Sequence, residues 1–230
     1  MKKVIIISLG GSLIVPNKIQ TKYLKEIKKI LLKNLKNYKF VIVCGGGSVA
    51  RNYMSALDHI KDKRKVYFQS MVGIAITRLN ARFVQHFFGI NQKQGIPHNI
   101  LSIKKSLKKN SIVFCGGLTY QKKETSDSAA AKIAKSLKCD FINLTNVKGL
   151  YDKNPQKYKS AKFIHEISHK EFFKIANKIK YKPGQHFVLD QKASKIIKQN
   201  NITTYILGSN TKNLDNLLNH KHFVGTIIKS

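Results

Sequence analysis

The chain opens with the stretch Val4-Ile5-Ile6-Ile7-Ser8-Leu9-Gly10-Gly11-Ser12, an apolar run that ends in a pair of glycines. A short β-branched run of this kind is typical of a strand buried on both faces of a parallel sheet. The pattern recurs where residues 40–43 precede Gly45-Gly46-Gly47, and where residues 112–114 precede Gly116-Gly117. Ligands bind outside the carboxyl ends of such strands, and glycine lets backbone N–H groups approach a phosphate there. The three turns therefore predict a site for several phosphate groups.

The composition predicts a folded protein without a membrane span. Hydrophobic residues make up 42% of the 230 residues, which is typical of a globular chain. The apolar runs are shorter than the roughly 18 residues that a membrane-spanning helix needs, and no cleavage site follows an apolar leader. We therefore expect a cytoplasmic protein with no membrane partner. Cys44, Cys115 and Cys139 are interpreted as small buried side chains in a reducing compartment, with a reactive thiol beside a glycine turn as the alternative.

The formal net charge of +32 raises the hypothesis of nucleic-acid binding, because contacts to phosphates scale with lysine and arginine. Lysine is, however, scattered through nearly every segment of the chain. No basic block with interleaved aromatic residues and no zinc-finger spacing is present in the sequence. We favour a solvated surface with a compositional bias, and we expect no dedicated nucleic-acid partner.

Apolar periodicity and turn residues predict an alternation of strands and helices along the chain. Strands are expected at residues 4–9, 40–43, 99–103, 112–114, 141–145, 203–207 and 226–228, and helices at 21–37, 49–57, 70–88, 129–137, 171–179, 191–199 and 214–218. Residues 126–128 are expected to cap the helix that starts at Ala129. The order predicts an α/β fold, a three-layer αβα sandwich around a mainly parallel sheet. We expect one domain over residues 1–230, built as two lobes.

Four motifs, taken together and in this order, resemble the amino acid kinase family. They are Ser8-Leu9-Gly10-Gly11-Ser12, Cys44-Gly45-Gly46-Gly47-Ser48-Val49-Ala50-Arg51, Thr125-Ser126-Asp127-Ser128-Ala129-Ala130 and Thr145-Asn146-Val147-Lys148-Gly149-Leu150-Tyr151. Leu189-Asp190 follows them, also in the expected order. The spacing of the glycines matches neither a P-loop nor a dinucleotide-binding fingerprint. Within the family, the chain is most similar to the archaeal type of uridylate (UMP) kinase.

The resemblance implies an activity and an assembly. The γ-phosphoryl group of ATP would be transferred to UMP, giving UDP and ADP, with Mg²⁺ as the cofactor. Such chemistry depends on aligning two anionic substrates and on stabilising the charge that passes between them. The resemblance also implies an acceptor-binding lobe over about residues 1–140 and an ATP-binding lobe over residues 141–230. The partners would be nucleotides and further copies of the chain, arranged as a hexamer.

The resemblance also implies roles for individual residues. Asp127 and Arg51 would be catalytic, and Asp127 would hold the metal. ATP would be bound by Gly10, Gly11, Ser12, Gly47, Arg51, Thr145, Asn146, Tyr151 and Asn154, and UMP by Gly46, Ser70, Gly117, Leu118, Thr125 and Ser126. From its position alone, Asp127 could simply complement a helix dipole. With only 11 acidic residues in the chain, we favour a functional role.

Two positions depart from the family pattern. Ser8 stands where many relatives carry a lysine, and Ser70 stands where UMP kinases place an aspartate for the acceptor. The loop at residues 118–124 is also longer and more basic than the loop that would face the uracil. Two alternatives therefore stay open: another small-molecule kinase of the same family, and a nucleotide-binding regulator with weak catalysis.

Overall fold

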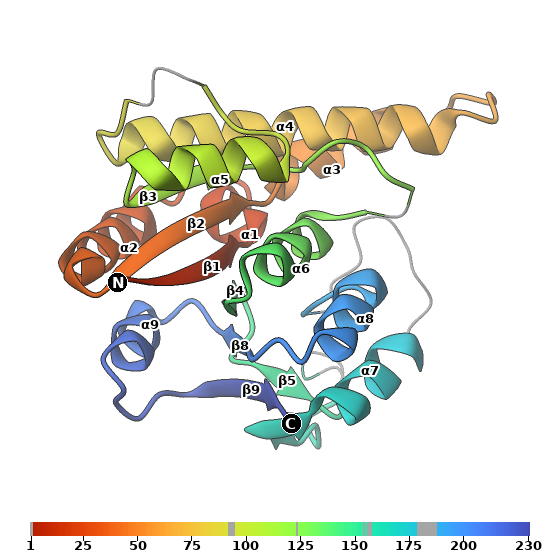
Figure 1. Ribbon diagram of the computed structural model, residues 1–230. Helices are drawn as coiled ribbons and strands as arrows, with labels where there is room; N and C mark the ends of the chain where they lie inside the picture. Colours follow the sequence, from red (N-terminus) through yellow and green to blue (C-terminus); the bar gives the residue numbers. More distant parts are fainter. Residues whose placement is uncertain (1, 92–94, 123, 154, 156–157, 179–187) are drawn as a thin grey trace.

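The computed structural model describes residues 2–91, 95–122, 124–153, 155, 158–178 and 188–230. Within these residues, one seven-stranded sheet forms the centre of the molecule, in the order β3-β2-β1-β4-β8-β9-β7 (Figure 1). The strands are β1 (Lys3–Leu9), β2 (Tyr38–Cys44), β3 (Ile112–Cys115), β4 (Asp140–Leu144), β7 (Glu166–Ser168), β8 (Thr204–Leu207) and β9 (Gly225–Lys229). β8 and β9 are antiparallel, and every other neighbouring pair in the sheet is parallel. A short hairpin pairs β5 (Leu150–Tyr151) with β6 (Phe163–Ile164).

Five strands, β1, β2, β3, β4 and β8, point their carboxyl ends at the same edge of the sheet. Leu9 at the end of β1 lies beside Cys44 of β2 and Leu144 of β4, and Leu144 lies beside Leu207 of β8. Cys115 of β3 pairs with the residue before Cys44. Because these ends are level, the segments that follow the strands leave the sheet together, which is where α/β proteins bind ligands.

Helices cover both faces of the sheet, because successive side chains of a strand point to opposite faces. Ile5 and Ile7 of β1 belong to one buried cluster, and Ile6 belongs to the other. The first cluster includes residues of α1 (Gly11–Ile14), α2 (Thr21–Lys33), α4 (Lys65–Phe87) and α9 (Thr211–Leu218). The second includes residues of α5 (Ile100–Lys109), α6 (Ser126–Leu137), α7 (His169–Lys178) and α8 (Gln191–Gln199). The predicted αβα sandwich is thus confirmed.

Two further helical segments complete the first layer. A 3₁₀ turn, η1 (Asn34–Lys36), continues α2, and α3 (Gly47–Ala56) packs against the long helix α4. α4 begins at Lys65, ahead of the expected start at residue 70, and its first turns project beyond the sheet in Figure 1. Among the described helices, none combines the length and apolar character that crossing a bilayer requires.

The strand expected at residues 99–103 is wrong, because this segment begins helix α5. The Asn99 side chain accepts a hydrogen bond from the Ser102 amide at 2.8 Å, and Ser102 Oγ lies 3.4 Å from the Asn99 amide. This reciprocal pair is a capping box, which satisfies backbone groups at a helix start. Ile103 and Leu107, four residues apart, are then buried on one face. The cap and the helical spacing outweigh the short apolar run.

The cap expected for α6 is also displaced. The helix begins at Ser126 rather than at Ala129, and Thr125 is its N-cap. Thr125 Oγ1 accepts from the amides of Asp127 and Ser128 at 3.2 and 3.3 Å. The Thr125 amide donates back to Ser128 Oγ at 2.8 Å. Asp127 therefore lies inside the first helical turn.

Candidate functional site

The first two glycine turns touch each other through their backbones. The Gly10 amide donates to the Leu144 carbonyl at 3.0 Å, and the Gly45 amide donates to the Leu9 carbonyl at 2.9 Å. A Cβ atom on Gly11 would lie 2.0 Å from the Gly47 nitrogen, so no side chain fits there. Gly47 also has a φ of +67°, which glycine adopts without strain. The backbones of the turns after β1 and β2 thus pack directly against each other at the sheet edge.

Helix α4 holds the third turn in the same region. A Cβ atom on Gly116 would lie 2.5 Å from the Arg78 nitrogen, and the Gly117 amide donates to Thr77 Oγ1 at 2.7 Å. The Arg78 guanidinium donates to the carbonyls of Gly117 and Leu118, each at 3.0 Å, and burial lowers the pKa of Arg78. Arg78 therefore fixes the start of the loop at residues 118–124.

Asn80 ties α4 to the second turn as well. Its side-chain amide donates to the Gly45 carbonyl at 2.8 Å and to the Gly46 carbonyl at 3.2 Å. The sequence reasoning missed both Arg78 and Asn80. The signal that could have found Asn80 is its position one residue before Ala81 and four before Val84, on the buried side of α4, because buried polar groups are almost always hydrogen-bonded.

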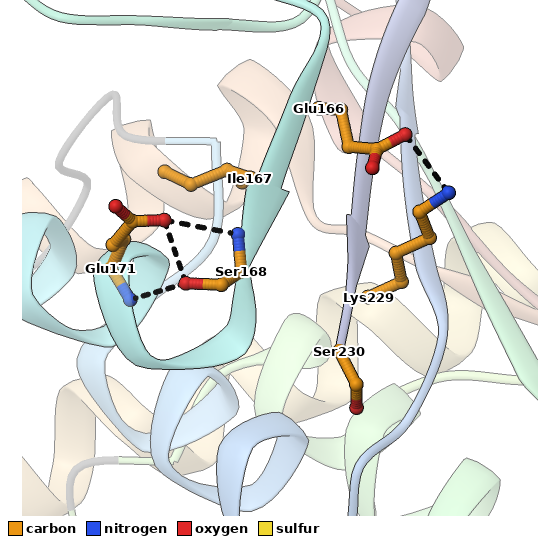
Figure 2. Close-up of a pocket in the computed structure, with 6 residues that line it drawn as sticks. All are labelled: Glu166, Ile167, Ser168, Glu171, Lys229 and Ser230. Atoms are coloured by element: carbon orange, nitrogen blue, oxygen red, sulfur yellow. Dashed lines mark hydrogen bonds and ion pairs between the residues drawn. The ribbon is translucent and has the colours of Figure 1, made fainter.

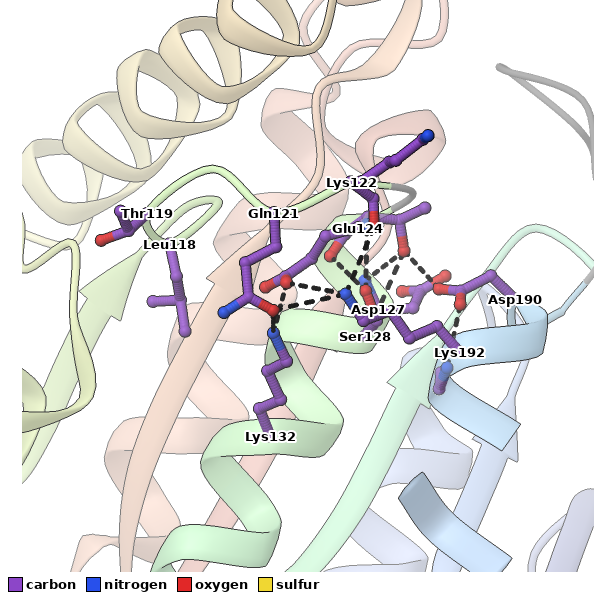
Figure 3. Close-up of polar contacts among 12 residues, drawn as sticks. Leu118, Thr119, Gln121, Lys122, Glu124, Asp127, Ser128, Lys132, Asp190 and Lys192 are labelled. Atoms are coloured by element: carbon purple, nitrogen blue, oxygen red, sulfur yellow. Dashed lines mark hydrogen bonds and ion pairs between the residues drawn. The ribbon is translucent and has the colours of Figure 1, made fainter. Parts of the chain in front are cut away.

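Asp127 lies at the centre of this edge, on the first turn of α6 (Figure 3). Ser8, buried at the end of β1, donates from Oγ to Asp127 Oδ1 at 2.8 Å. Burial, and then the nearby Asp190 carboxylate, raise the pKa of Asp127 to about 7, against the lowering effect of the Ser8 hydrogen bond. Ser8 thus connects the strand that precedes the first glycine turn to the acidic group.

A second carboxylate, Asp190, joins the starts of two helices. Thr125 Oγ1 donates a short hydrogen bond to Asp190 Oδ2, while Asp190 Oδ1 accepts from the Ala193 amide at 2.9 Å and caps α8. The amino ends of α6 and α8 therefore meet beside the glycine turns. Helix amino termini favour anions, so this arrangement suits phosphate groups. Asp190 was quoted as part of a motif but was not predicted as a site residue.

The donor set fits Mg²⁺. Within the described residues no group of three or more histidine, cysteine or acidic side chains gathers to form a protein-only metal cage. Mg²⁺ is usually held by one or two carboxylates together with substrate phosphates, and it does not need such a cage. Asp127 offers a buried carboxylate whose pKa is raised by burial and then by the Asp190 carboxylate. A divalent cation at Asp127 would favour the charged form of that carboxylate.

The predicted ATP-side residues are only partly gathered at this edge. Thr145 follows β4, its amide donates to the Leu207 carbonyl at 2.9 Å, and its hydroxyl contacts Asn146 Oδ1 at 3.4 Å. Tyr151 lies in the β5–β6 hairpin, where its ring packs edge-on against Phe163 with 5.4 Å between centroids. Asn154 lies outside the described residues.

Most of the other predicted site residues also lie next to the glycine turns, but Ser70 lies further along α4. Ser12 and Arg51 lie in the short helices that follow the first two turns, and Leu118 and Ser126 lie at the two ends of the segment that follows the third. Ser70 is about two turns before Thr77 on α4, and its hydroxyl donates to the Val66 carbonyl at 2.7 Å, so its described bond lies within the helix.

A separate depression of about 310 Å³ lies at the far edge of the sheet, lined by β7, β9 and the start of α7 (Figure 2). Its charged groups are paired within the lining, and the Ser230 hydroxyl contacts His169 Nδ1 at 3.5 Å. Glu171 accepts from the amide and hydroxyl of Ser168, and Lys229 Nζ lies 2.9 Å from a Glu166 carboxylate oxygen. The depression therefore offers no set of free groups comparable with the edge beside Asp127.

Comparisons with known proteins identify the family and agree with the fold. The model of the amino acid kinase family matches residues 3–208. The uridylate kinase of Methanopyrus kandleri is 30% identical over 228 residues, covering 97% of this chain and 98% of that protein. The uridylate kinase of Thermococcus sibiricus is 30% identical over 230 residues, covering 98% and 99%. The crystal structure of uridylate kinase from Archaeoglobus fulgidus superposes with a TM-score of 0.83 at 29% identity, covering 99% of this chain and all of that one. The chain belongs to the amino acid kinase family.

Proposed function

We propose that the protein is a UMP kinase that transfers the γ-phosphoryl group of ATP to UMP, giving ADP and UDP for pyrimidine nucleotide synthesis. Similarity to uridylate kinases over nearly the whole chain supports this function. The observation that carries it is that three glycine turns follow strands ending at one edge of the sheet, where Asp127 and the starts of α6 and α8 also lie. Glycine turns at strand ends and helix amino termini both favour bound phosphate groups, so this edge can accept the phosphates of two nucleotides.

The backbone and side chains divide the work between the substrates. Gly10, Gly11, Ser12 and Gly47 bind the ATP phosphates, and Gly46 faces the acceptor phosphate. Arg51, in the first turns of α3, adds a planar guanidinium suited to phosphate oxygens. Thr145, Asn146, Tyr151 and Asn154 form the pocket of the ATP base and ribose, and Ser70, Gly117, Leu118, Thr125 and Ser126 face UMP.

Asp127 organises the reacting centre. When Mg²⁺ is bound, it neutralises phosphate charge and helps to align donor and acceptor. Asp127 holds that ion through its carboxylate, and Ser8 keeps the carboxylate oriented through the 2.8 Å hydrogen bond. The amino end of α6 stabilises negative charge at the same place. Residues 1–140 act as the acceptor lobe and residues 141–230 as the ATP lobe.

The protein works as a homo-oligomer, a hexamer, in the cytoplasm. Support for assembly comes from α4, whose exposed side chains include Val66, Tyr67, Met71 and Leu79, with Leu79 58% exposed. Large apolar side chains gathered on one projecting helix are typical of a protein–protein contact. A second copy of α4 is the natural partner for that surface.

The test is ADP release with a panel of acceptors. UMP should stimulate turnover well above carbamate, acetylglutamate or isopentenyl phosphate, which represent other small-molecule kinases. Equal rates with all acceptors would contradict the assignment of UMP. Tight ATP binding with no turnover on any acceptor would instead favour the alternative of a nucleotide-binding regulator, which the serines at positions 8 and 70 motivate.

A further inference from the structure

The loop at residues 118–124 ends in a buried ion-pair cluster beside the proposed active site. The Glu124 side chain is only 9% exposed, and its Oε2 contacts Nζ of Lys132 and, at 3.3 Å, Nζ of Lys192. Lys132 lies on α6 and Lys192 lies on α8, so a lysine from each of two helices contacts the same loop carboxylate (Figure 3). The cluster joins the loop to both helices.

Lys192 makes further contacts to the same loop. Its ammonium group lies 3.4 Å from the Gln121 side-chain oxygen and 3.4 Å from the Lys122 carbonyl. The Glu124 amide also donates to the Gln121 carbonyl at 3.1 Å, so two of the residues that Lys192 contacts are bonded to each other. A single side chain from α8 thus contacts three positions of the loop.

The loop is fixed at both ends by cations. Arg78 donates to the Gly117 and Leu118 carbonyls where the loop begins, and Lys192 contacts Glu124 where it ends. The residue after Glu124 is Thr125, which is bonded to Asp190, two positions before Lys192 on the chain. Two adjacent links therefore join this loop to the start of α8, one through Thr125 and one through Glu124.

We propose that Lys192 is a positioning residue for phosphoryl transfer, acting through Glu124 to hold the acceptor-side loop against the ATP-side helix α8. The proposal rests on the proposed function for the identity of the two substrates. An acceptor held by the loop is then aligned with the phosphoryl donor, and misplacement of a reacting group by about 1 Å can cost about 100-fold in rate.

Lys132 makes the proposal testable without loss of the fold. Removing the only cation near a buried carboxylate is strongly destabilising. In Lys192→Met, however, Glu124 keeps its contact with Lys132 on α6. Only the contacts of Lys192 with the loop are lost, while the bond from Thr125 to Asp190 still joins the loop to the start of α8. We therefore expect a folded variant with a misplaced loop.

Steady-state kinetics of Lys192→Met should separate the two substrates. We expect kcat/KM for UMP to fall about 10- to 100-fold. KM for ATP should change less than about twofold, because the ATP contacts are left in place. Glu124→Gln should cause a similar loss, and the double variant should lose little more than either single variant, as expected for two residues that act as one unit. Lys192→Arg should recover most of the activity.

Lys198→Met is the matched control. Lys198 lies on the same helix, but its ammonium group stacks over Phe173 at 4.5 Å and is not among the described contacts of the loop. This variant should keep the kinetic constants of the original protein. If Lys192→Met also kept them, the proposal would be wrong. If the losses in Lys192→Met and Glu124→Gln multiplied in the double variant, Lys192 would act on the phosphates directly, and the proposal would again fail.

Hydrogen exchange separates failure of this link from failure of the proposed function. Peptides covering residues 118–125 should exchange faster in Lys192→Met than in Lys198→Met, whatever the acceptor, because the Glu124 amide loses its fixed geometry. Unchanged exchange would overturn the link itself. Faster exchange in a protein that does not phosphorylate UMP would overturn only the identity of the acceptor.

Discussion

Asp127 makes the stability of the substrate-free protein depend on pH. Burial, followed by the Asp190 charge, raises its pKa from the ordinary value of 3.8 to about 7. Between these values the folded protein holds a proton that the unfolded chain has released, so stability decreases as pH rises through this window and levels off above it. Relative to Asp127→Asn, the free energy of unfolding of the original protein should therefore decline from pH 5 to pH 7.5. Urea denaturation measures it, and a difference independent of pH would contradict the assignment.

Gly11 tests the contact between the first two turns. A methyl group there would collide with the Gly47 backbone. Relieving the collision requires the first two glycine turns, which we propose bind phosphate, to move apart. We expect Gly11→Ala to lose about 1–3 kcal/mol of stability and most of its affinity for ATP. Gly73→Ala on α4 is the control, because its Cβ would meet only the flexible sulfur of Met54 on α3, at 3.2 Å. Equal ATP affinities of the two variants, measured by calorimetry, would show that the turns do not form the binding surface.

The amino end of α6 is the element on which the site depends most. Thr125 and Asn99 are both N-caps with capping boxes, but only Thr125 is also bonded to Asp190. Replacing either by alanine should cost about 1 kcal/mol of stability. Thr125→Ala should lower turnover as well, because the link to α8 is lost, whereas Asn99→Ala should keep it. Paired unfolding and ADP-release measurements check this, and equal turnover of the two variants would refute the role of the Thr125–Asp190 link.

The sequence predicts those helices and strands that are determined by patterns within a few neighbouring residues. The β-branched runs ending in glycine gave the parallel strands and their common edge, because both signals act within a few residues. The strand predicted at residues 99–103 is wrong, because the apolar pattern of five residues does not distinguish a buried strand from the first turn of a capped helix. The bond from Thr125 to Asp190 spans 65 positions, and no local pattern reveals such a contact. Arg78 and Asn80 were missed for the same reason.

The part of the site that could be predicted from the sequence is the part that the strand ends and glycine turns position. The glycine turns, Thr125, Asp127 and Thr145 lie at one edge, as the strand ends required. Their roles toward each substrate stay predictions. Ser70 shows the limit, since position on a helix does not reveal where its hydroxyl is bonded, and the structure gives it a bond to Val66 within α4.

The whole molecule is expected to assemble through α4. Val66, Met71 and Leu79 are exposed on this helix, and removing them from water in a contact with another copy would stabilise an oligomer. Sedimentation should give a species much larger than the 26.1 kDa chain at micromolar concentration. Leu79→Glu should dissociate it, while Leu32→Glu on α2, at another exposed leucine, should not. A monomeric original protein would contradict this arrangement.

We propose that one edge of the sheet binds both nucleotides and passes a phosphoryl group between them. The most direct test of this claim follows the label from ATP carrying a radioactive γ-phosphate, in the presence of Mg²⁺ and UMP. The account predicts that the label appears in the β-phosphate of UDP. In Asp127→Asn, transfer should fall by about 100-fold or more although ATP still binds. Label released only as inorganic phosphate, or equal transfer by Asp127→Asn, would contradict the claim.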